Sequence, residues 1–139
     1  LKLPFTDADV VIAGRAGKPI PRIFAENGEA AFRALEAEVI AEYGCRGGQV
    51  ISTGGGAVLR AENRMNLRMN SVVIGLTRPI ERLSTAGRPL SGDTSALQRM
   101  WEERAPLYRM TSDRTVDNAG TLEECVRAVL EAYHEALGD

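Results

Sequence analysis

The sequence predicts a layered α/β domain with a parallel sheet, and three observations support this fold class. Short β-branched runs alternate with helical patterns along the chain, which is typical of parallel strands joined by helices. One strand-like run leads directly into three consecutive glycines at positions 54–56. The 139 residues are 44% hydrophobic and 26% charged, a composition typical of a globular protein. We therefore expect one domain over residues 1–139, with roughly two-thirds of its unfolded surface buried.

The charge balance and the cysteine content exclude several classes of protein. Lys and Arg number 17 and Asp and Glu number 19, so the formal net charge is −2, which argues against a protein that coats nucleic acid. No apolar run approaches the roughly 18 residues of a transmembrane helix, and no signal-peptide core is visible. A cytoplasmic protein without a membrane partner is therefore expected. Cys45, Cys125 and the single histidine lack the spacing of a zinc site or a disulfide framework.

Apolar spacing and glycines predict the elements of the first half of the chain. A strand ends near Phe5, and a helix follows between residues 10 and 17. A short helix over 19–26 and a longer one over 29–43 are separated by Asn27-Gly28. The longer helix has a predicted buried stripe at helical spacing, formed by Phe32, Leu35, Val39, Ile40 and Tyr43. A buried strand over 49–53 and a helix over 61–69 are predicted on either side of the glycines.

The second half of the chain continues the same alternation. Residues 71–76 show the clearest strand pattern, and a short helix over 79–83 and a polar loop over 84–93 follow. The helix predicted over 94–110 contains Pro106, so a kink is expected there. A strand at 115–117 precedes a capping box at 121–124, which begins the last helix. The core face predicted for that helix consists of Leu122, Val126, Val129, Leu130, Tyr133 and Leu137.

Two carboxylates, Asp7 and Asp9, lie where the first strand is predicted to end. On an extended backbone, residues at this spacing lean to the same side, at the sheet edge where open α/β folds bind ligands. One carboxylate could face a hydrated Mg²⁺ and the other a substrate hydroxyl. A helix N-cap followed by a solvated loop acid explains the same pair, and this is the more frequent origin of an isolated D-x-D motif.

The three glycines, Gly54, Gly55 and Gly56, follow a β-branched strand. Because each lacks a Cβ, a ligand could lie directly on their backbone N–H groups. A flexible loop between a strand and a helix is the alternative explanation.

Three arginines are candidates for anion binding, and each also has a structural explanation. Arg33 has Glu29 at i−4 and Glu36 at i+3, as in an ion-pair ladder on a helix surface. Arg109 complements the dipole at the end of its helix. Arg88 lies in a loop with nearby glycines, as an arginine of a mobile lid would, although a solvated loop arginine looks the same.

Taken in order, the segments FTDAD, IFAENGEAAFRALE, ISTGGGAV, GRPLSG and ERAPLYR resemble shikimate kinase over nearly the whole chain. The resemblance implies a three-layer, parallel-sheet P-loop kinase-like fold, similar to that of nucleoside monophosphate kinases. It implies an enzyme that transfers the γ-phosphoryl group of ATP to the 3-hydroxyl of shikimate, on the route to chorismate and the aromatic amino acids. Mg²⁺ as cofactor and ATP as co-substrate are implied with it. We expect a monomer that binds neither nucleic acid nor membranes.

The resemblance also implies roles for individual residues. Asp7 matches an acid that helps to hold Mg²⁺ through water, and Asp9 matches the acid that contacts shikimate hydroxyls and accepts the proton. Arg33 and Arg109 match the pair that binds the substrate carboxylate, which suits the planar guanidinium fork. Gly54, Gly55 and Gly56 match the backbone surface under the ring.

Further roles are implied for nucleotide binding. Arg88, in a lid predicted over 84–93, matches the arginine that reaches the phosphates and stabilises charge in the transition state. Arg82 is similar to the residue that stacks near adenine, and Asp117 and Asn118 fall where the adenine loop begins.

The sequence departs from the family pattern at one point, because it contains no G-x-x-x-x-G-K-[ST] motif. The family places that phosphate loop before the first acidic pair, so we expect a strand, loop and helix of about 30 residues upstream of Leu1. The fold expected for the 139 residues accordingly lacks its first strand and P-loop. We expect the 139 residues alone not to turn over ATP. Truncation, a fusion boundary and a decayed paralogue remain as explanations.

Two other functions fit the same residues. One is a non-catalytic module that binds shikimate, and the other is a kinase of another small hydroxy-acid such as gluconate. The presence of both Arg33 and Arg109 favours a substrate with a ring carboxylate.

Overall fold

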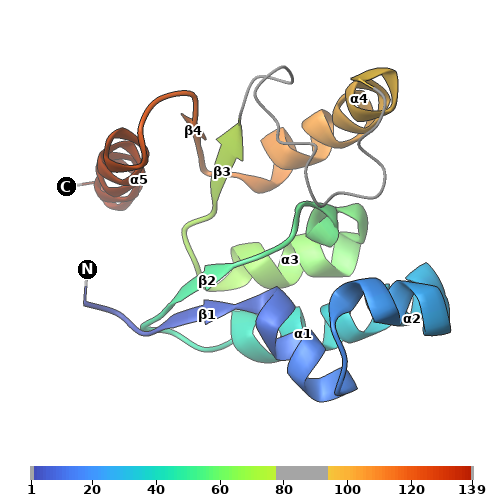
Figure 1. The fold of residues 1–139 in the computed structure, drawn as a ribbon. Helices are drawn as coiled ribbons and strands as arrows, with labels where there is room; N and C mark the ends of the chain where they lie inside the picture. The colour runs from blue at the N-terminus through green and yellow to red at the C-terminus, as the bar shows by residue number, and fades with distance from the viewer. Residues whose placement is uncertain (1, 78–93, 139) are drawn as a thin grey trace. The chain divides into compact units, whose positions relative to one another are not determined.

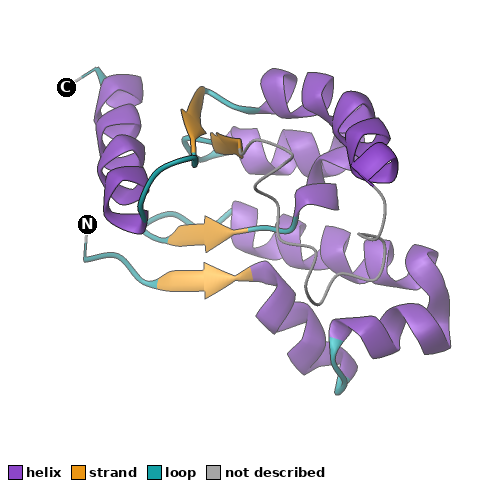
Figure 2. Cartoon of the chain, turned by 45° about the horizontal axis from the view of Figure 1, so that its top comes forward, coloured by secondary structure: helices purple, strands orange, loops and turns teal. Residues whose placement is uncertain are grey.

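The computed structural model describes residues 2–77 and 94–138, and these fall into two compact units that divide between Ser71 and Val72 (Figure 1). Each unit contains a pair of parallel strands together with helices, as the predicted α/β class requires (Figure 2). The short helix predicted over 79–83 and the lid predicted over 84–93 lie outside the described residues, as do Arg82 and Arg88.

The first unit has two strands, three α-helices and one short 3-10 helix. In chain order these are β1 (Phe5–Asp7), α1 (Ala8–Ala16), α2 (Ile20–Gly44), β2 (Val50–Ser52), the 3-10 helix η1 (Gly55–Leu59) and α3 (Ala61–Met69). The strands run parallel with Phe5 opposite Val50 and Asp7 opposite Ser52. Both strands therefore end at the same edge, where the chain enters α1 from β1 and η1 from β2.

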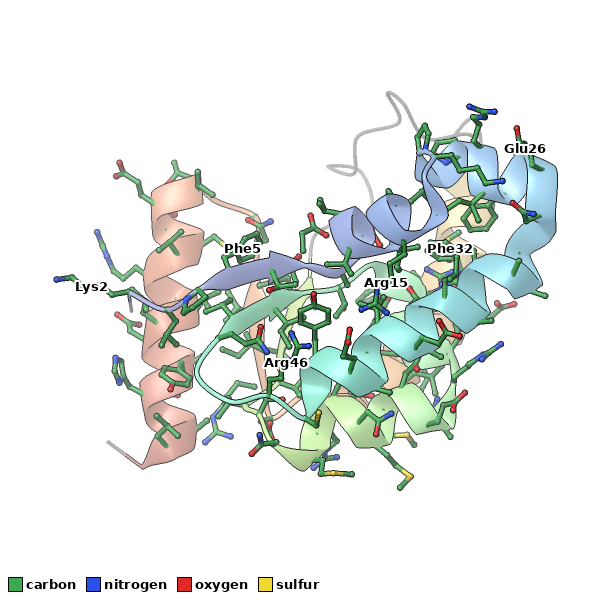
Figure 3. The ribbon with its side chains drawn as sticks, turned by 90° about the horizontal axis from the view of Figure 1, so that it is seen from below. Lys2, Phe5, Arg15, Glu26, Phe32 and Arg46 are labelled. Atoms are coloured by element: carbon green, nitrogen blue, oxygen red, sulfur yellow. The ribbon has the colours of Figure 1, made fainter. Side chains whose placement is uncertain are left out.

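Helix α2 is interrupted at Gly28, where φ is 85° and ψ is 168°. A side chain would be strained in this conformation, and glycine adopts it freely. The predicted separation into a short and a long helix at Asn27-Gly28 is therefore confirmed. Arg15, near the end of α1, forms an ion pair with Glu42 near the end of α2 (Figure 3).

The core of the first unit lies between α1 and α2. Its buried members are Ala8, Ile12, Ile23, Phe32 and Val39. The predicted stripe of α2 is confirmed, because Phe32, Val39 and Ile40 are buried and Leu35 and Tyr43 pack against the core. The prediction of a buried strand over 49–53 is wrong for Val50, which is 39% exposed. Side chains alternate along a strand, and Ile51 is the one that lies near Val39 and Ile40.

The second unit contains β3 (Ile74–Thr77), α4 (Thr94–Thr111), β4 (Arg114–Asp117) and α5 (Leu122–Leu137). The strands run parallel, and β3 begins three residues later than the predicted strand over 71–76. Asp113 fixes the start of the pair, because its Oδ2 accepts a hydrogen bond of 2.8 Å from the backbone N–H of Val73. Helix α4 continues through Pro106 to Thr111.

Helix α5 begins at the predicted cap, where the Thr121 hydroxyl accepts a hydrogen bond of 3.2 Å from the N–H of Glu124. The predicted core face is wrong for Leu122, Val126 and Leu137, which are 80%, 50% and 51% exposed. It is correct for Val129, which packs against the core, while Leu130 and Tyr133 are half-buried. The buried side chains of α5 are those of Cys125 and Ala132, which cluster with Val116 of β4. Among the described residues, no helix is long and apolar enough to cross a membrane.

Candidate functional site

The first acidic residue of the candidate site, Asp7, is the last residue of β1 and the N-cap of α1. Its Oδ1 accepts a hydrogen bond of 2.9 Å from the backbone N–H of Asp9. The expectation that Asp7 and Asp9 share an extended strand is therefore wrong, because Asp9 lies in the first turn of α1. The physical reason is local: a carboxylate N-cap pairs an otherwise free amide and begins the helix immediately after the strand. The alternative of a helix N-cap was correct for Asp7.

Asp9 is partly buried, and its surroundings favour the protonated form. Burial raises the pKa of Asp9, the nearby Asp7 carboxylate raises it further, and Arg33 offsets part of the rise. Oδ1 of Asp9 is buried and has no hydrogen-bond partner among the described residues. A Cβ built on Gly54 would lie 3.4 Å from Oδ1 and 3.5 Å from Oδ2, so the backbone of Gly54 is adjacent to this carboxylate. Asp9 thus presents an acceptor oxygen beside the glycine turn.

Arg33, on the long part of α2, is held by acidic side chains of its own helix. Its Nη1 donates a hydrogen bond of 2.9 Å to Oε1 of Glu36, and its Nε lies 3.5 Å from Oε1 of Glu29. The predicted partners of Arg33 are confirmed, but the expected surface ladder is wrong for Glu36, whose side chain is only 2% exposed. A buried carboxylate fixes a guanidinium more firmly than a solvated one, because water does not screen the pair.

Gly56 contacts the guanidinium of Arg33 so closely that a side chain would fit only if the guanidinium moved. A Cβ at Gly56 would overlap Nη1 and Nη2 of Arg33 and would lie 2.6 Å from Cζ. The turn after β2 therefore meets the acid of α1 at Gly54 and the cation of α2 at Gly56. The structure brings together six of the predicted site residues: Asp7, Asp9, Arg33, Gly54, Gly55 and Gly56.

Two residues that sequence reasoning missed hold the same turn from α3. The side-chain amide of Asn63 donates a hydrogen bond of 3.0 Å to the carbonyl of Ala57, and Nη1 of Arg64 donates one of 2.7 Å to the carbonyl of Val58. Asn63 is fully buried. The sequence did offer a sign of this contact, since an asparagine and an arginine stand side by side in the first turn of the helix that follows the glycines.

The other predicted site residues belong to the second unit or lie outside the described residues. Arg109 is exposed in the last turn of α4. Asp117 ends β4, and the N–H of Asn118 donates to the carbonyl of Thr77 at 2.6 Å. The pairing of Arg109 with Arg33 on one carboxylate stays a prediction, as do the roles of Arg82 and Arg88. Within residues 2–77 and 94–138, no group of three or more His, Cys, Asp or Glu side chains could hold a metal ion.

The chain matches known proteins over almost its entire length. The family model for shikimate kinase matches residues 1–134. The shikimate kinase of Halorhodospira halophila is 43% identical over 141 residues, which cover 95% of this chain and 80% of that protein. The shikimate kinase of Thiobacillus denitrificans is 44% identical over 123 residues, which cover 83% of this chain and 67% of that protein.

Solved structures agree with these matches. The crystal structure of shikimate kinase from Aquifex aeolicus has a TM-score of 0.83 at 32% identity, over 99% of this chain and 85% of that one. Shikimate kinase from Acinetobacter baumannii, in complex with shikimate, has a TM-score of 0.81 at 30% identity, over 93% of this chain and 79% of that one. The predicted P-loop kinase-like fold and phosphotransferase class are confirmed, and the non-catalytic module and the gluconate kinase are not favoured. Family model, relatives and solved structures lead to one conclusion: the chain belongs to the shikimate kinase family.

Proposed function

We propose that Asp9, Arg33 and the backbone of residues 54–56 form the shikimate half of an active site. The reaction of this family is the transfer of the γ-phosphoryl group of ATP to shikimate, with ATP as co-substrate. The observation that supports the proposal is the glycine turn, which contacts the Asp9 carboxylate at Gly54 and the Arg33 guanidinium at Gly56. A hydroxy-acid that lies on this turn would meet an acceptor for its hydroxyl groups and a cation for its carboxylate.

Arg33 supplies the cation of this proposal. A guanidinium offers a planar fork of N–H donors that matches a carboxylate in two places. One donor is already bound to Glu36, and the buried Nε has no hydrogen bond among the described residues, because its contact with Glu29 is long. The fork is thus oriented by the protein and retains donors for a ligand. We propose Arg109 as the second cation on the same carboxylate.

Asp9 supplies the acceptor. A carboxylate whose pKa is raised above the ordinary value takes a proton from a substrate hydroxyl more readily than a fully solvated aspartate does. Its buried Oδ1 lacks a partner among the described residues, which leaves an oxygen for that hydroxyl. We therefore propose that Asp9 orients the reacting hydroxyl and accepts its proton.

Asp7 is the residue proposed to hold Mg²⁺, through a bound water. Carboxylate oxygens are ligands that this ion prefers, and Asp7 lies next to a second carboxylate residue, Asp9, whose backbone N–H it binds. The residues therefore fit the ion. When bound, Mg²⁺ would neutralise charge on the phosphates of ATP. Arg88 and Arg82 are proposed for the nucleotide side, and the protein is proposed to act as a cytoplasmic monomer.

The test is kinetic and uses the protein expressed from its complete reading frame. Arg33→Ala and Arg109→Ala should each weaken shikimate binding by about 2–4 kcal/mol, as expected when one side of a charged pair is lost. The KM for ATP should stay near the wild-type value. Arg22→Ala is the matched control, because Arg22 also lies on α2 and pairs with a glutamate, but its side chain is 65% exposed. Unchanged shikimate KM and kcat in both variants would refute the assignment.

A further inference from the structure

The 3-10 helix η1 is tied to α3 by side chains that bond its backbone. The last carbonyls of a short helix have no partners within the helix and require them from elsewhere. Asn63 and Arg64 supply them, with hydrogen bonds of 3.0 Å to Ala57 and 2.7 Å to Val58. Two consecutive residues of α3 therefore hold two consecutive carbonyls of η1.

Asn63 is an unusual residue for its position. It is 0% exposed, and its Oδ1 is buried with no hydrogen-bond partner among the described residues. A buried acceptor without a partner lowers stability, so packing alone would not favour an asparagine here. The bond from its Nδ2 to Ala57 is therefore the contact that explains the residue.

The backbone held in this way is the backbone that contacts Arg33. Gly56 directly precedes Ala57, is buried, and lies so close to Nη1 and Nη2 of Arg33 that a Cβ would overlap them. The same guanidinium is bound by the buried Glu36. The guanidinium of Arg33 thus lies between Glu36 and Gly56, so its orientation depends on the position of the η1 backbone.

We infer that Asn63 and Arg64 are positioning residues, which hold η1 against the Arg33 guanidinium and so set the orientation in which Arg33 meets the carboxylate of the substrate. The inference rests on the proposed role of Arg33. Neither residue needs to touch the substrate, because both act through the backbone of Gly56. They would affect the affinity for the hydroxy-acid and leave the affinity for ATP unchanged.

The experiment uses Asn63→Leu, which keeps a similar volume, and Arg64→Met, which keeps the aliphatic stem. Each removes a donor to η1. In the protein expressed from its complete reading frame, each should raise the shikimate KM by roughly 10- to 100-fold, the scale that a displacement of about 1 Å can produce. Leu67→Ala is the control, because Leu67 lies on α3 near Val39 and Ile40 and its loss weakens packing without removing a bond to η1.

The decisive measurement repeats both substitutions in an Arg33→Ala background. If Asn63 and Arg64 act through Arg33, neither substitution should change the shikimate KM further once Arg33 is absent. We take a change of less than about twofold as no change, because the effects of independent substitutions normally add only to within that factor. An equal change with and without Arg33, or the same KM change in Leu67→Ala at a matched melting temperature, would overturn the inference. Should Asn63→Leu fail to fold, the half-exposed Arg64 decides the question. An unchanged shikimate KM in Arg33→Ala alone would instead refute the proposed role of Arg33.

Discussion

Replacing Gly56 with alanine should disable the proposed site without removing any of its functional groups. The new Cβ would lie 2.6 Å from Cζ of Arg33 and closer still to both Nη atoms, and ordinary contacts begin at 3.4 Å, so the guanidinium must move by at least 3.4 − 2.6 = 0.8 Å. A shift of that size can break the 2.9 Å bond between Arg33 and Glu36. A misplacement of about 1 Å can lower the rate about 10²-fold, and we expect a loss of that order in kcat/KM for shikimate.

The assay follows ADP formation while the concentration of shikimate is varied. Gly54→Ala is the matched control, because its Cβ would lie 3.4 Å and 3.5 Å from the oxygens of Asp9, which is ordinary contact. Its φ of −71° is also one that alanine adopts without strain. We expect Gly54→Ala to lose much less kcat/KM than Gly56→Ala. Equal losses in the two variants, or no loss in Gly56→Ala, would refute the argument from the guanidinium.

Three further predictions concern the charged groups and the backbone. Asp9→Asn should lower kcat by about 10²-fold. Because the pKa of Asp9 is raised in the folded protein, ionised Asp9 lowers the stability at pH values above its ordinary pKa of 3.8. The melting temperature of Asp9→Asn should therefore be a few degrees higher than that of the wild type at pH 7, and this gain should disappear below about pH 4. A gain that does not depend on pH would contradict this. Glu36→Gln should reduce the free energy of unfolding, measured in urea, by up to about 3–5 kcal/mol, because Arg33 then keeps a poorly solvated charge without its buried partner. The control is Glu29→Gln, and a loss in Glu36→Gln no larger than in this control would contradict the prediction. In the same denaturation experiment, Gly28→Ala should destabilise the protein by about 1–3 kcal/mol. The control Gly14→Ala should not, because Gly14 lies in the middle of α1 and a Cβ there would meet nothing within 4 Å. Similar effects of the two substitutions would argue against a strained backbone at position 28.

Local signals in the sequence predicted much of the fold. The break at Gly28 was predictable because an Asn-Gly pair inside a helical pattern favours a conformation that other residues avoid. The start of α5 was predictable because a threonine followed by a glutamate three residues later pairs the first amides of a helix. Both features depend only on neighbouring residues.

Features that depend on tertiary contacts were harder to predict. Leu122 and Leu137 have the right period for a core face, but periodicity does not say where along a helix a partner lies. Helix α5 instead buries Cys125 and Ala132, and only the middle of the predicted face, at Val129, packs against them. The spacing of two aspartates likewise suggested an extended pair, although Asp7 begins a helix. In the candidate site, Asn63 was missed because a polar residue near the start of a helix normally indicates a solvent-exposed face.

The close approach of Gly56 to Arg33 also limits how sequences of this protein can diverge. Residues 33 and 56 are far apart in the chain, yet a side chain at position 56 and a guanidinium from position 33 require the same volume. A mutation that adds a side chain at position 56 therefore displaces the guanidinium of an arginine at position 33, and it disturbs the site least where residue 33 is already smaller. We therefore expect glycine at position 56 to accompany arginine at position 33 among sequences of this protein.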